Sequence, residues 1–367
     1  MKKRIVVTGG HHNSALVVAE KLQKKGYQVI WLGHKFTMQG DRNPSAEYQE
    51  VTRAGFKFVE IKAGKSHRVF HPANLIRLPL GFIQSFYYLL KFRPKLILSF
   101  GGYLAVPVVI CGWLLRIPSI THEQTVVYGL ANRLISFFAK KVMVSWQASL
   151  KHFPPNKVIF TGLPLRKEIF GHEKGKFDFK NNLPTIYITG GKQGSHLINQ
   201  AVKNSFKTLL KKYNLIHQSG GGTVYDDFSQ LKEARINLPS KLKERYFLKD
   251  YFFRNEIGQV LAAADLVVSR AGAHTIYEIM ALGKPSLLIP ISWSHFNEQT
   301  KNAQFLVESG IAEILLEDKL SGKALIAETE KMISNLSQYQ QNAFKTKKLV
   351  RLDATQKIVE LIEKTAQ

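Results

Sequence analysis

Residues 269–278 have the sequence SRAGAHTIYE, and this stretch decides how the C-terminal half of the chain folds. It follows DLVV at residues 265–268, an apolar run typical of a buried parallel strand. It leads into IMALG at residues 279–283, where a glycine ends a helical turn. A strand, a small-residue turn and a helix start together offer backbone N–H groups to a phosphate. Glu278, about one turn inside the helix, is placed to reach a ribose hydroxyl. The alternative is an ordinary loop with a solvated glutamate.

The length and composition are those of a two-domain globular protein. The chain has 367 residues, of which 45% are hydrophobic and 22% charged. Its single cysteine, Cys111, excludes a disulfide within the chain and a cysteine metal cluster, and it fits a reducing compartment. The N-terminus runs directly into a strand, so we expect no signal peptide there.

The chain is strongly basic, with a formal net charge of +25. Between Glu60 and Glu123 there are eight Lys and Arg residues and no acidic residue. Such a surface is expected to attract an anionic partner, which could be a nucleic acid, a phospholipid or a phosphorylated substrate. The charge alone does not choose among these partners.

Two apolar segments raise the question of a membrane. Residues 96–115 carry no charge, but Gly101, Gly102 and Pro107 interrupt them, which favours a buried strand, a glycine turn and a buried helix over a membrane span. The segment that begins at Leu75 and ends at Lys95 is dense in leucines and aromatic residues. It fits either a helix packed on a sheet or a patch that contacts a bilayer surface.

Both halves of the chain begin with the same pattern. Residues 5–10 read IVVTGG and residues 186–191 read IYITGG, about 180 residues apart, and each is followed by a helical pattern. Neither turn is GxGxxG, so nothing supports a dinucleotide site. Repetition of the unit predicts two similar α/β domains that face each other. Further strands are expected at residues 28–32, 58–61, 95–100, 118–120, 141–144, 214–218, 245–248, 265–269, 285–291 and 312–316.

These motifs, in this order, resemble the MurG family of GT-B glycosyltransferases over nearly the full length. The motifs are Thr8-Gly9-Gly10-His11, Gly101-Gly102-Tyr103, His122-Glu123-Gln124, Gly162 to Arg166, Gly190 to Gly194, His217-Gln218-Ser219-Gly220, Ser269 to Glu278, and Gln299 with Asn302-Ala303. The resemblance implies two facing Rossmann-like parallel-sheet domains with a cleft between them. It also implies transfer of N-acetylglucosamine from UDP-GlcNAc to the 4-hydroxyl of MurNAc in undecaprenyl-pyrophosphoryl-MurNAc-pentapeptide, which converts lipid I to lipid II in peptidoglycan synthesis.

The resemblance also implies a division of labour along the chain. Residues 1–163 form an acceptor-side and membrane-facing domain, residues 164–345 form the UDP-GlcNAc domain, and residues 346–367 form a helix that packs back on the N-terminal domain. The enzyme would act at the cytoplasmic face of the cell membrane as a peripheral protein. Its partners would be UDP-GlcNAc, a polyprenyl-pyrophosphate-linked acceptor and, through the segment from Leu75 to Lys95, an anionic membrane surface, with no nucleic acid.

Site residues follow from the same resemblance. His11 is the candidate base, and Glu278, which would hold the ribose, is the second residue of the catalytic set. The residues expected to contact UDP-GlcNAc are Thr8, Gly9, Gly10, Thr125, Arg166, Lys192, Arg254, Ala273, His274, Thr275, Ile276, Tyr277, Glu278 and Gln299. The residues expected on the acceptor side are His11, His12, Asn13, Gly101, Gly102, Tyr103, His122, Glu123 and Gln124. Lys192 and His274 depart from the family pattern and would add positive charge near the phosphates.

The expected reaction needs a base for the hydroxyl proton and stabilisation of the departing diphosphate. The sequence has no Asp-x-Asp pair, so we expect helix N-termini and basic side chains to act in place of a divalent metal, and no cofactor. Imidazole groups titrate near neutrality, which suits a histidine such as His11 for proton transfer, although His11 or His12 could serve only to shape the loop.

Two other functions stay open at this point. A GT-B enzyme could use the same donor, or a similar UDP-sugar, on another lipid-linked acceptor. A basic nucleic-acid-binding protein would explain the charge, but the chain contains no known nucleic-acid module, and the glycine loops would have no role.

Overall fold

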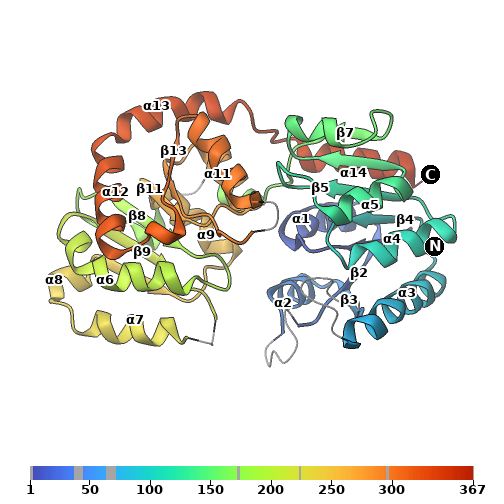
Figure 1. Cartoon of the computed structure of the whole chain (residues 1–367), viewed down its shortest axis with the longest axis horizontal. Helices are drawn as coiled ribbons and strands as arrows, with labels where there is room; N and C mark the ends of the chain where they lie inside the picture. Colours follow the sequence, from blue (N-terminus) through green and yellow to red (C-terminus); the bar gives the residue numbers. More distant parts are fainter. Residues whose placement is uncertain are drawn as a thin grey trace. The chain divides into compact units, whose positions relative to one another are not determined.

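The computed structural model describes residues 3–36, 44–62, 72–171, 174–222, 225–294 and 297–366, and for residues 72–78 and 255 it describes the backbone only. The chain forms two compact units. The first unit contains Met1–Arg166 and Arg351–Gln367, and the second contains Lys167–Val350. Each unit is built on one parallel β-sheet flanked by helices (Figure 1).

The first unit has a seven-stranded sheet in the order β3-β2-β1-β4-β5-β6-β7. Because β1 lies between β2 and β4, the strand order reverses there. The elements are β1 (Arg4–Thr8), α1 (His12–Lys24), β2 (Gln28–Gly33), α2 (Ala46–Arg53), β3 (Lys57–Glu60), α3 (Pro72–Phe92), β4 (Leu96–Ser99), α4 (Ala105–Leu114), β5 (Ser119–Glu123), α5 (Leu130–Phe138), β6 (Lys141–Val144), η1 (Gln147–His152), β7 (Val158–Phe160) and α14 (Ala354–Thr365).

Alternating side chains of β1 bury both faces of this sheet. Ile5 and Val7 belong to one core cluster, which includes residues of α1 and, from the end of the chain, Ile358 of α14. Val6 belongs to the opposite cluster, formed with α3, α4 and α5. All three of these β1 side chains are fully buried. A strand buried on both faces reads as a continuous apolar run, which is why the pattern at residues 5–7 was diagnostic.

The second unit has a six-stranded sheet in the order β10-β9-β8-β11-β12-β13, and its order reverses between β8 and β11. Its elements are η2 (Lys167–Ile169), η3 (Gly175–Phe177), β8 (Thr185–Thr189), α6 (His196–Lys212), β9 (Asn214–Gln218), α7 (Asp227–Ile236), α8 (Ser240–Lys243), β10 (Tyr246–Lys249), α9 (Arg254–Ala263), β11 (Leu266–Ser269), α10 (Ala273–Leu282), β12 (Ser286–Leu288), α11 (Glu298–Glu308), β13 (Ala312–Ile314), η5 (Glu317–Lys319), α12 (Gly322–Ser334) and α13 (Leu336–Lys347).

The fold class predicted from the sequence is confirmed, since both units are α/β with parallel sheets. Each expected strand is present, although β12 ends at Leu288 rather than near residue 291. The elements α2, α5 and β7 were not expected from the sequence. Residues 96–115 form β4, a glycine turn and α4, as expected. Within the part of the chain that the structure covers, no helix has both the length and the apolarity needed to cross a bilayer.

Two glycine loops of the second unit pack backbone against backbone. The β8–α6 turn and the loop after β9 are joined by bonds from Gly221 N to Lys192 O (3.2 Å) and from Gly222 N to Gln193 O (3.1 Å). At Gly194, where φ is +81°, a Cβ atom would overlap the carbonyl oxygen of Ser219. Only glycine allows this approach, so the loop sequences are fixed by packing as well as by any ligand.

Replacement of Gly194 with alanine should therefore lower the midpoint of thermal unfolding. The added methyl group clashes with backbone, and the left-handed conformation adds roughly 1–2 kcal/mol of strain. Gly221 is the matched control, because a Cβ there would meet nothing within 4 Å. Differential scanning calorimetry of Gly194→Ala and Gly221→Ala measures the difference, and equal midpoints would contradict the packing described here.

Candidate functional site

The first glycine loop lies at the strand-order reversal of the first unit. It follows β1, and Gly10 N donates to Gly101 O (3.2 Å) in the loop that follows β4. A Cβ atom on Gly9, where φ is +129°, would lie 2.7 Å from the backbone of Phe100. Thr8 ends β1 with its hydroxyl buried and without a hydrogen-bond partner among the described residues. The bond between Gly10 and Gly101 brings the predicted Thr8–His11 and Gly101–Tyr103 motifs together. They meet at the edge where open parallel sheets bind ligands.

His122 lies beneath this loop in the interior. Its Nε2 atom is 3.0 Å from the carbonyl oxygen of Gly162. A carbonyl can only accept, so Nε2 carries the proton and Nδ1 is left as an acceptor with no partner in the described part of the chain. Burial lowers the pKa of His122 to about 4, partly offset by the bond to Gly162, and the nearby His11 lowers it further. His122 is therefore a neutral residue of the interior, close to His11.

Glu123 also points inward. Its Oε1 accepts from the backbone N–H and hydroxyl of Thr125 (3.1 and 2.8 Å), and its Oε2 accepts from Gly129 N (3.0 Å) and Asn132 Nδ2 (2.9 Å). Gly129 is the N-cap of α5, so the carboxylate lies at the positive end of that helix. The expected acceptor residue Glu123 and the expected donor residue Thr125 are thus occupied with each other and anchor the loop before α5. The next residue, Gln124, is buried as well.

Two more of the expected acceptor residues contact α2 and its surroundings. His12, the first residue of α1, forms an ion pair with Glu50 (3.4 Å). The ring of Tyr103 lies 5.7 Å from that of His34, and burial raises the pKa of Tyr103 well above its usual value. Since α2 was not anticipated, the pairing of His12 with Glu50 was missed. Asn13 follows His12 within α1.

The second site begins at the start of α10 in the second unit. Gly272 is the N-cap, and the first intrahelical bond is from Ile276 N to Gly272 O (3.0 Å), so the N–H groups of residues 273–275 are not used within the helix. Glu278, only 6% exposed, pairs through Oε1 with His274 Nε2 at 3.1 Å, one helical turn earlier. Ile276 and Tyr277 are buried in the core, so their expected role would have to involve the backbone.

Other expected donor residues lie on α9, on α11 and in the β8–α6 turn. Gln299 Oε1 accepts from Ile291 N (3.1 Å), which fixes the loop after β12. Arg254, the first residue of α9, forms an ion pair with Glu168 (3.1 Å). Lys192 Nζ lies 5.8 Å from the centre of the Tyr251 ring. The second unit holds these residues and α10, whereas the expected donor residues Thr8, Gly9, Gly10, Thr125 and Arg166 belong to the first unit.

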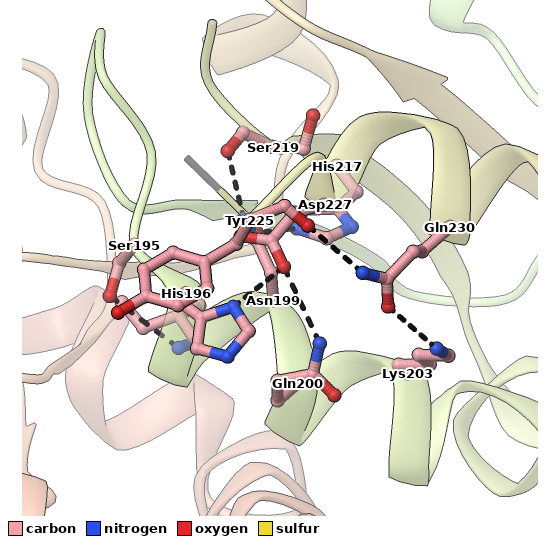
Figure 2. A network of polar contacts seen from close by, with 11 residues as sticks. Ser195, His196, Asn199, Gln200, Lys203, His217, Ser219, Tyr225, Asp227 and Gln230 are labelled. Atoms are coloured by element: carbon pink, nitrogen blue, oxygen red, sulfur yellow. Dashed lines mark hydrogen bonds and ion pairs between the residues drawn. The ribbon is translucent and has the colours of Figure 1, made fainter. Parts of the chain in front are cut away.

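Sequence reasoning missed a polar network beside the β8–α6 turn (Figure 2). Asp227, at the start of α7, accepts from His196 Nδ1 (2.8 Å) and from Asn199 Nδ2 (3.0 Å) on α6. Tyr225 stacks on the His196 ring, with 3.9 Å between ring centroids. Asn199 also bonds His217 Nε2 (3.1 Å), so the network runs from an exposed tyrosine into the core. It ties the loop after β9 to α6.

Among the described residues, no group of three His, Cys, Asp or Glu side chains is arranged to hold a metal ion.

Comparison with known proteins identifies the family. The model of the glycosyltransferase family 28 N-terminal domain matches residues 6–144, and that of the C-terminal domain matches residues 185–360. A relative from Clostridium tetani, named UDP-N-acetylglucosamine–N-acetylmuramyl-(pentapeptide) pyrophosphoryl-undecaprenol N-acetylglucosamine transferase, is 32% identical over 376 residues, covering 99% of this chain and 98% of its own. The chain belongs to the MurG family of glycosyltransferases. A relative with the same name from Treponema denticola is 36% identical over 84% of this chain and 82% of its own.

Solved structures agree on the fold of this MurG family member. The crystal structure of Acinetobacter baumannii MurG matches with a TM-score of 0.71 and 24% identity, covering 99% of both chains. A Staphylococcus aureus MnaA structure with UDP matches with a TM-score of 0.66 and 12% identity, over 99% of this chain and 96% of its own. At these identities the likeness shows the GT-B fold alone.

The buried His122 makes a testable contribution to the pH dependence of stability. Its pKa is about 4 in the folded chain and near 6.5 when unfolded, so the unfolded chain binds the extra proton first as the pH falls. The contribution of His122 to the free energy of unfolding should be constant above pH ~6.5 and should fall by roughly 1.4 kcal/mol per pH unit down to pH ~4. Denaturant titrations of the wild type and of His122→Gln measure this, because the variant cannot titrate and should show a flatter profile.

In NMR titration, the His122 ring resonances should stay at their neutral positions at pH 5. A midpoint near 6.5 for His122 in the folded protein would contradict its burial with Nε2 bound to Gly162.

Proposed function

We propose that this MurG family member transfers N-acetylglucosamine from UDP-GlcNAc to undecaprenyl-pyrophosphoryl-MurNAc-pentapeptide, the step from lipid I to lipid II. One observation carries the proposal: a relative named for this transfer matches 99% of the chain at 32% identity. The position of the two glycine loops supports the proposal, because they lie at the strand-order reversals of the two sheets, where open parallel sheets bind ligands.

The donor would bind to the second unit. The N–H groups of the first turn of α10 suit the diphosphate, because they combine hydrogen-bond donors with the positive end of the helix dipole. His274 lies in this first turn, and its Nε2 atom, 3.1 Å from Oε1 of Glu278, limits the orientations of that carboxylate, which we assign to the ribose hydroxyls. Gln299 would meet the sugar, and Lys192 would lend positive charge to the departing diphosphate.

The acceptor would approach the first unit. Its 4-hydroxyl oxygen attacks the anomeric carbon as the bond to the diphosphate oxygen breaks, and UDP leaves with the electron pair. We assign the hydroxyl proton to His11, which lies in the loop after β1. His122, held neutral beneath this loop, would add no positive charge that opposes protonation of His11. Helix N-termini and basic side chains would stabilise the diphosphate in place of a divalent metal.

The decisive experiment is transfer of radiolabelled N-acetylglucosamine from UDP-GlcNAc to purified lipid I in detergent, with EDTA present. Labelled lipid II is the expected product. Donor binding without transfer to lipid I would move the acceptor to another lipid-linked sugar. Transfer that requires added metal would overturn the metal-independent mechanism, and absence of donor binding would overturn the function.

We further propose that the first unit docks on an anionic lipid surface through the outer sides of α3, α4 and α5. In that unit α4 packs between α3 and α5 (Figure 1). Leu89 of α3 is buried in the core, so this helix is packed on the sheet, yet it also presents apolar residues to solvent. Exposed apolar side chains on the three helices are Ile83, Phe86, Tyr87, Leu90, Trp113, Leu114, Leu130, Leu134 and Phe137.

Exposed basic residues accompany this apolar surface. Lys91 lies at the end of α3, and Arg93 and Lys95 lie just beyond it. Arg116 follows α4, and Arg133 lies on α5. Apolar area combined with positive charge is the signature of binding to an anionic interface. A helix packed on the sheet and a patch that contacts a bilayer were the two alternatives for this segment. They are compatible, because one face of α3 packs on the sheet and the other is exposed to solvent. The first part of the segment, residues 75–78, lies outside the described side chains.

Replacement of Ile83 with serine should weaken binding to vesicles that contain anionic lipid. Ile83 is 66% exposed on α3, and burying an isoleucine in the interface contributes roughly 1.5–3 kcal/mol. Ile236→Ser is the control, since Ile236 is 60% exposed but lies on α7 of the second unit. Co-sedimentation should separate the two variants. Equal binding of both, or equal binding of the wild type to neutral and anionic vesicles at low salt, would contradict this docking surface.

Replacement of Glu278 with alanine should weaken the binding of UDP-GlcNAc about tenfold or more, because a charged hydrogen bond contributes roughly 1.5–3 kcal/mol. The fold should persist, since Glu278 lies at the edge of the core. Glu330→Ala is a control in the same unit, because it removes a carboxylate whose partner is Lys212 at 2.7 Å. Isothermal titration calorimetry gives both affinities, and an unchanged donor affinity in Glu278→Ala would show that its assignment is wrong.

A further inference from the structure

The side chain of Arg270, two residues before the N-cap of α10, donates to two side chains and one backbone carbonyl on three other segments. Nη2 donates to the hydroxyl of Ser195 (2.7 Å) and to Oε1 of Glu317 (2.5 Å), and Nη1 donates to the carbonyl of Ile289 (3.1 Å). The side chains of Arg270 and Glu317 are 13% and 9% exposed. One guanidinium therefore connects the segments that follow β8, β11, β12 and β13.

Glu317 extends this connection. Its Oε2 accepts from the backbone N–H (3.2 Å) and the hydroxyl (2.9 Å) of Ser292, in the loop after β12. Burial opposes ionisation of this carboxyl, but the bonds from Ser292 and Arg270 outweigh it and hold the pKa of Glu317 below its usual value. The carboxylate stays charged, and both of its oxygens are committed to fixed partners.

The connected positions include the N-termini of α6 and α10, where the proposed donor diphosphate would bind. Ser195 is the N-cap of α6, where its hydroxyl accepts from Ile198 N (3.5 Å), and Arg270 directly precedes the turn into α10. The Ser292 loop also contains Ile291, whose N–H is bonded to Gln299. A largely buried, hydrogen-bonded ion pair has one well-defined geometry, because moving either charge leaves the other without its partner and only partly solvated.

We propose that Arg270 and Glu317 are positioning residues for the nucleoside-diphosphate part of the donor. Their ion pair fixes the Arg270 guanidinium, whose bond to Ser195 sets the spacing between the N-termini of α6 and α10, and Glu317 holds the Ser292 loop, so that two sets of backbone N–H groups converge on one diphosphate. This inference rests on the proposed use of a UDP-sugar. The competing interpretation is a structural clamp that stabilises the unit without affecting the ligand.

Ser195→Ala separates the two interpretations. It removes the link between Arg270 and the cap of α6 while leaving the ion pair in place. Ser321→Ala is a matched control in the same unit, because Ser321 caps α12 by accepting from Ala324 N (3.1 Å) and has no arginine partner in the described structure. Loss of a hydrogen bond to a charged group predicts a rise of about tenfold in the Kd for UDP in Ser195→Ala. No rise in the Kd is expected in Ser321→Ala, although its midpoint of unfolding should also fall because a helix cap is lost.

A second pair of variants tests the carboxylate itself. Glu317→Gln keeps the shape and removes the charge, and Glu330→Gln does the same to the more exposed pair with Lys212. We expect Glu317→Gln to raise the KM for UDP-GlcNAc about tenfold and Glu330→Gln to leave it unchanged. Because positioning acts on donor binding, kcat at saturating donor should change less than twofold in Glu317→Gln.

The outcomes distinguish this inference from the proposed function. If the wild type binds UDP and the Kd of Ser195→Ala stays within twofold of it, or if Ser321→Ala raises the Kd equally, the ion pair is a structural clamp and the inference is wrong. If the wild type binds neither UDP nor UDP-GlcNAc, the proposed function fails first.

Discussion

Both candidate sites depend on the requirement that parallel strands end at one edge of their sheet. Each strand leaves its last residues there, and the connection to the next helix must start from the same edge. In the second unit this places Ser195, Arg270 and Glu317 within hydrogen-bonding distance, although they are separated by up to 122 residues of chain. In the first unit it brings Gly10 onto Gly101. The chemistry of the sites is arranged on this geometry, and the glycines are needed because several backbones converge in little space.

The strands of both sheets could be predicted from the sequence, but the hydrogen-bond and ion-pair partners of the buried charged residues could not. Strands such as β1 and β11 are buried on both faces, so their apolar runs could be recognised without knowledge of their neighbours. The glycine motifs marked the ends of the right strands. By contrast, the pairing of Glu123 with the start of α5 depends on a helix that has no strong sequence signal, and His12 with Glu50 depends on α2 in the same way. Arg270 lay inside the diagnostic motif, but nothing local in the sequence indicated that Glu317 would be its partner.

Two glutamates that could be mistaken for ligand-binding residues turn inward, whereas the surface lysines and arginines stay exposed to solvent. Glu123 is buried and the side chain of Glu317 is only 9% exposed; both carboxylates accept from several donors, and both hold loops at the edge of a sheet. In a chain with 52 basic and 27 acidic residues, each buried carboxylate leaves the surface still more positive. The basic residues around α3, α4 and α5 therefore face solvent with little local compensation, which suits a protein whose proposed substrates carry phosphate.

The helix α14 closes the core of the first unit, with Ile358 and Ile362 packed in the same cluster as Leu16 of α1. The second unit is consequently an insertion within the first, and only the second is a contiguous piece of chain. During synthesis the first unit would begin to form first and yet be completed last, after all of the inserted unit has left the ribosome. Until then, one apolar side of α1 lacks its partner. Packing of α14 is therefore the step that completes the core of the unit that is synthesised first.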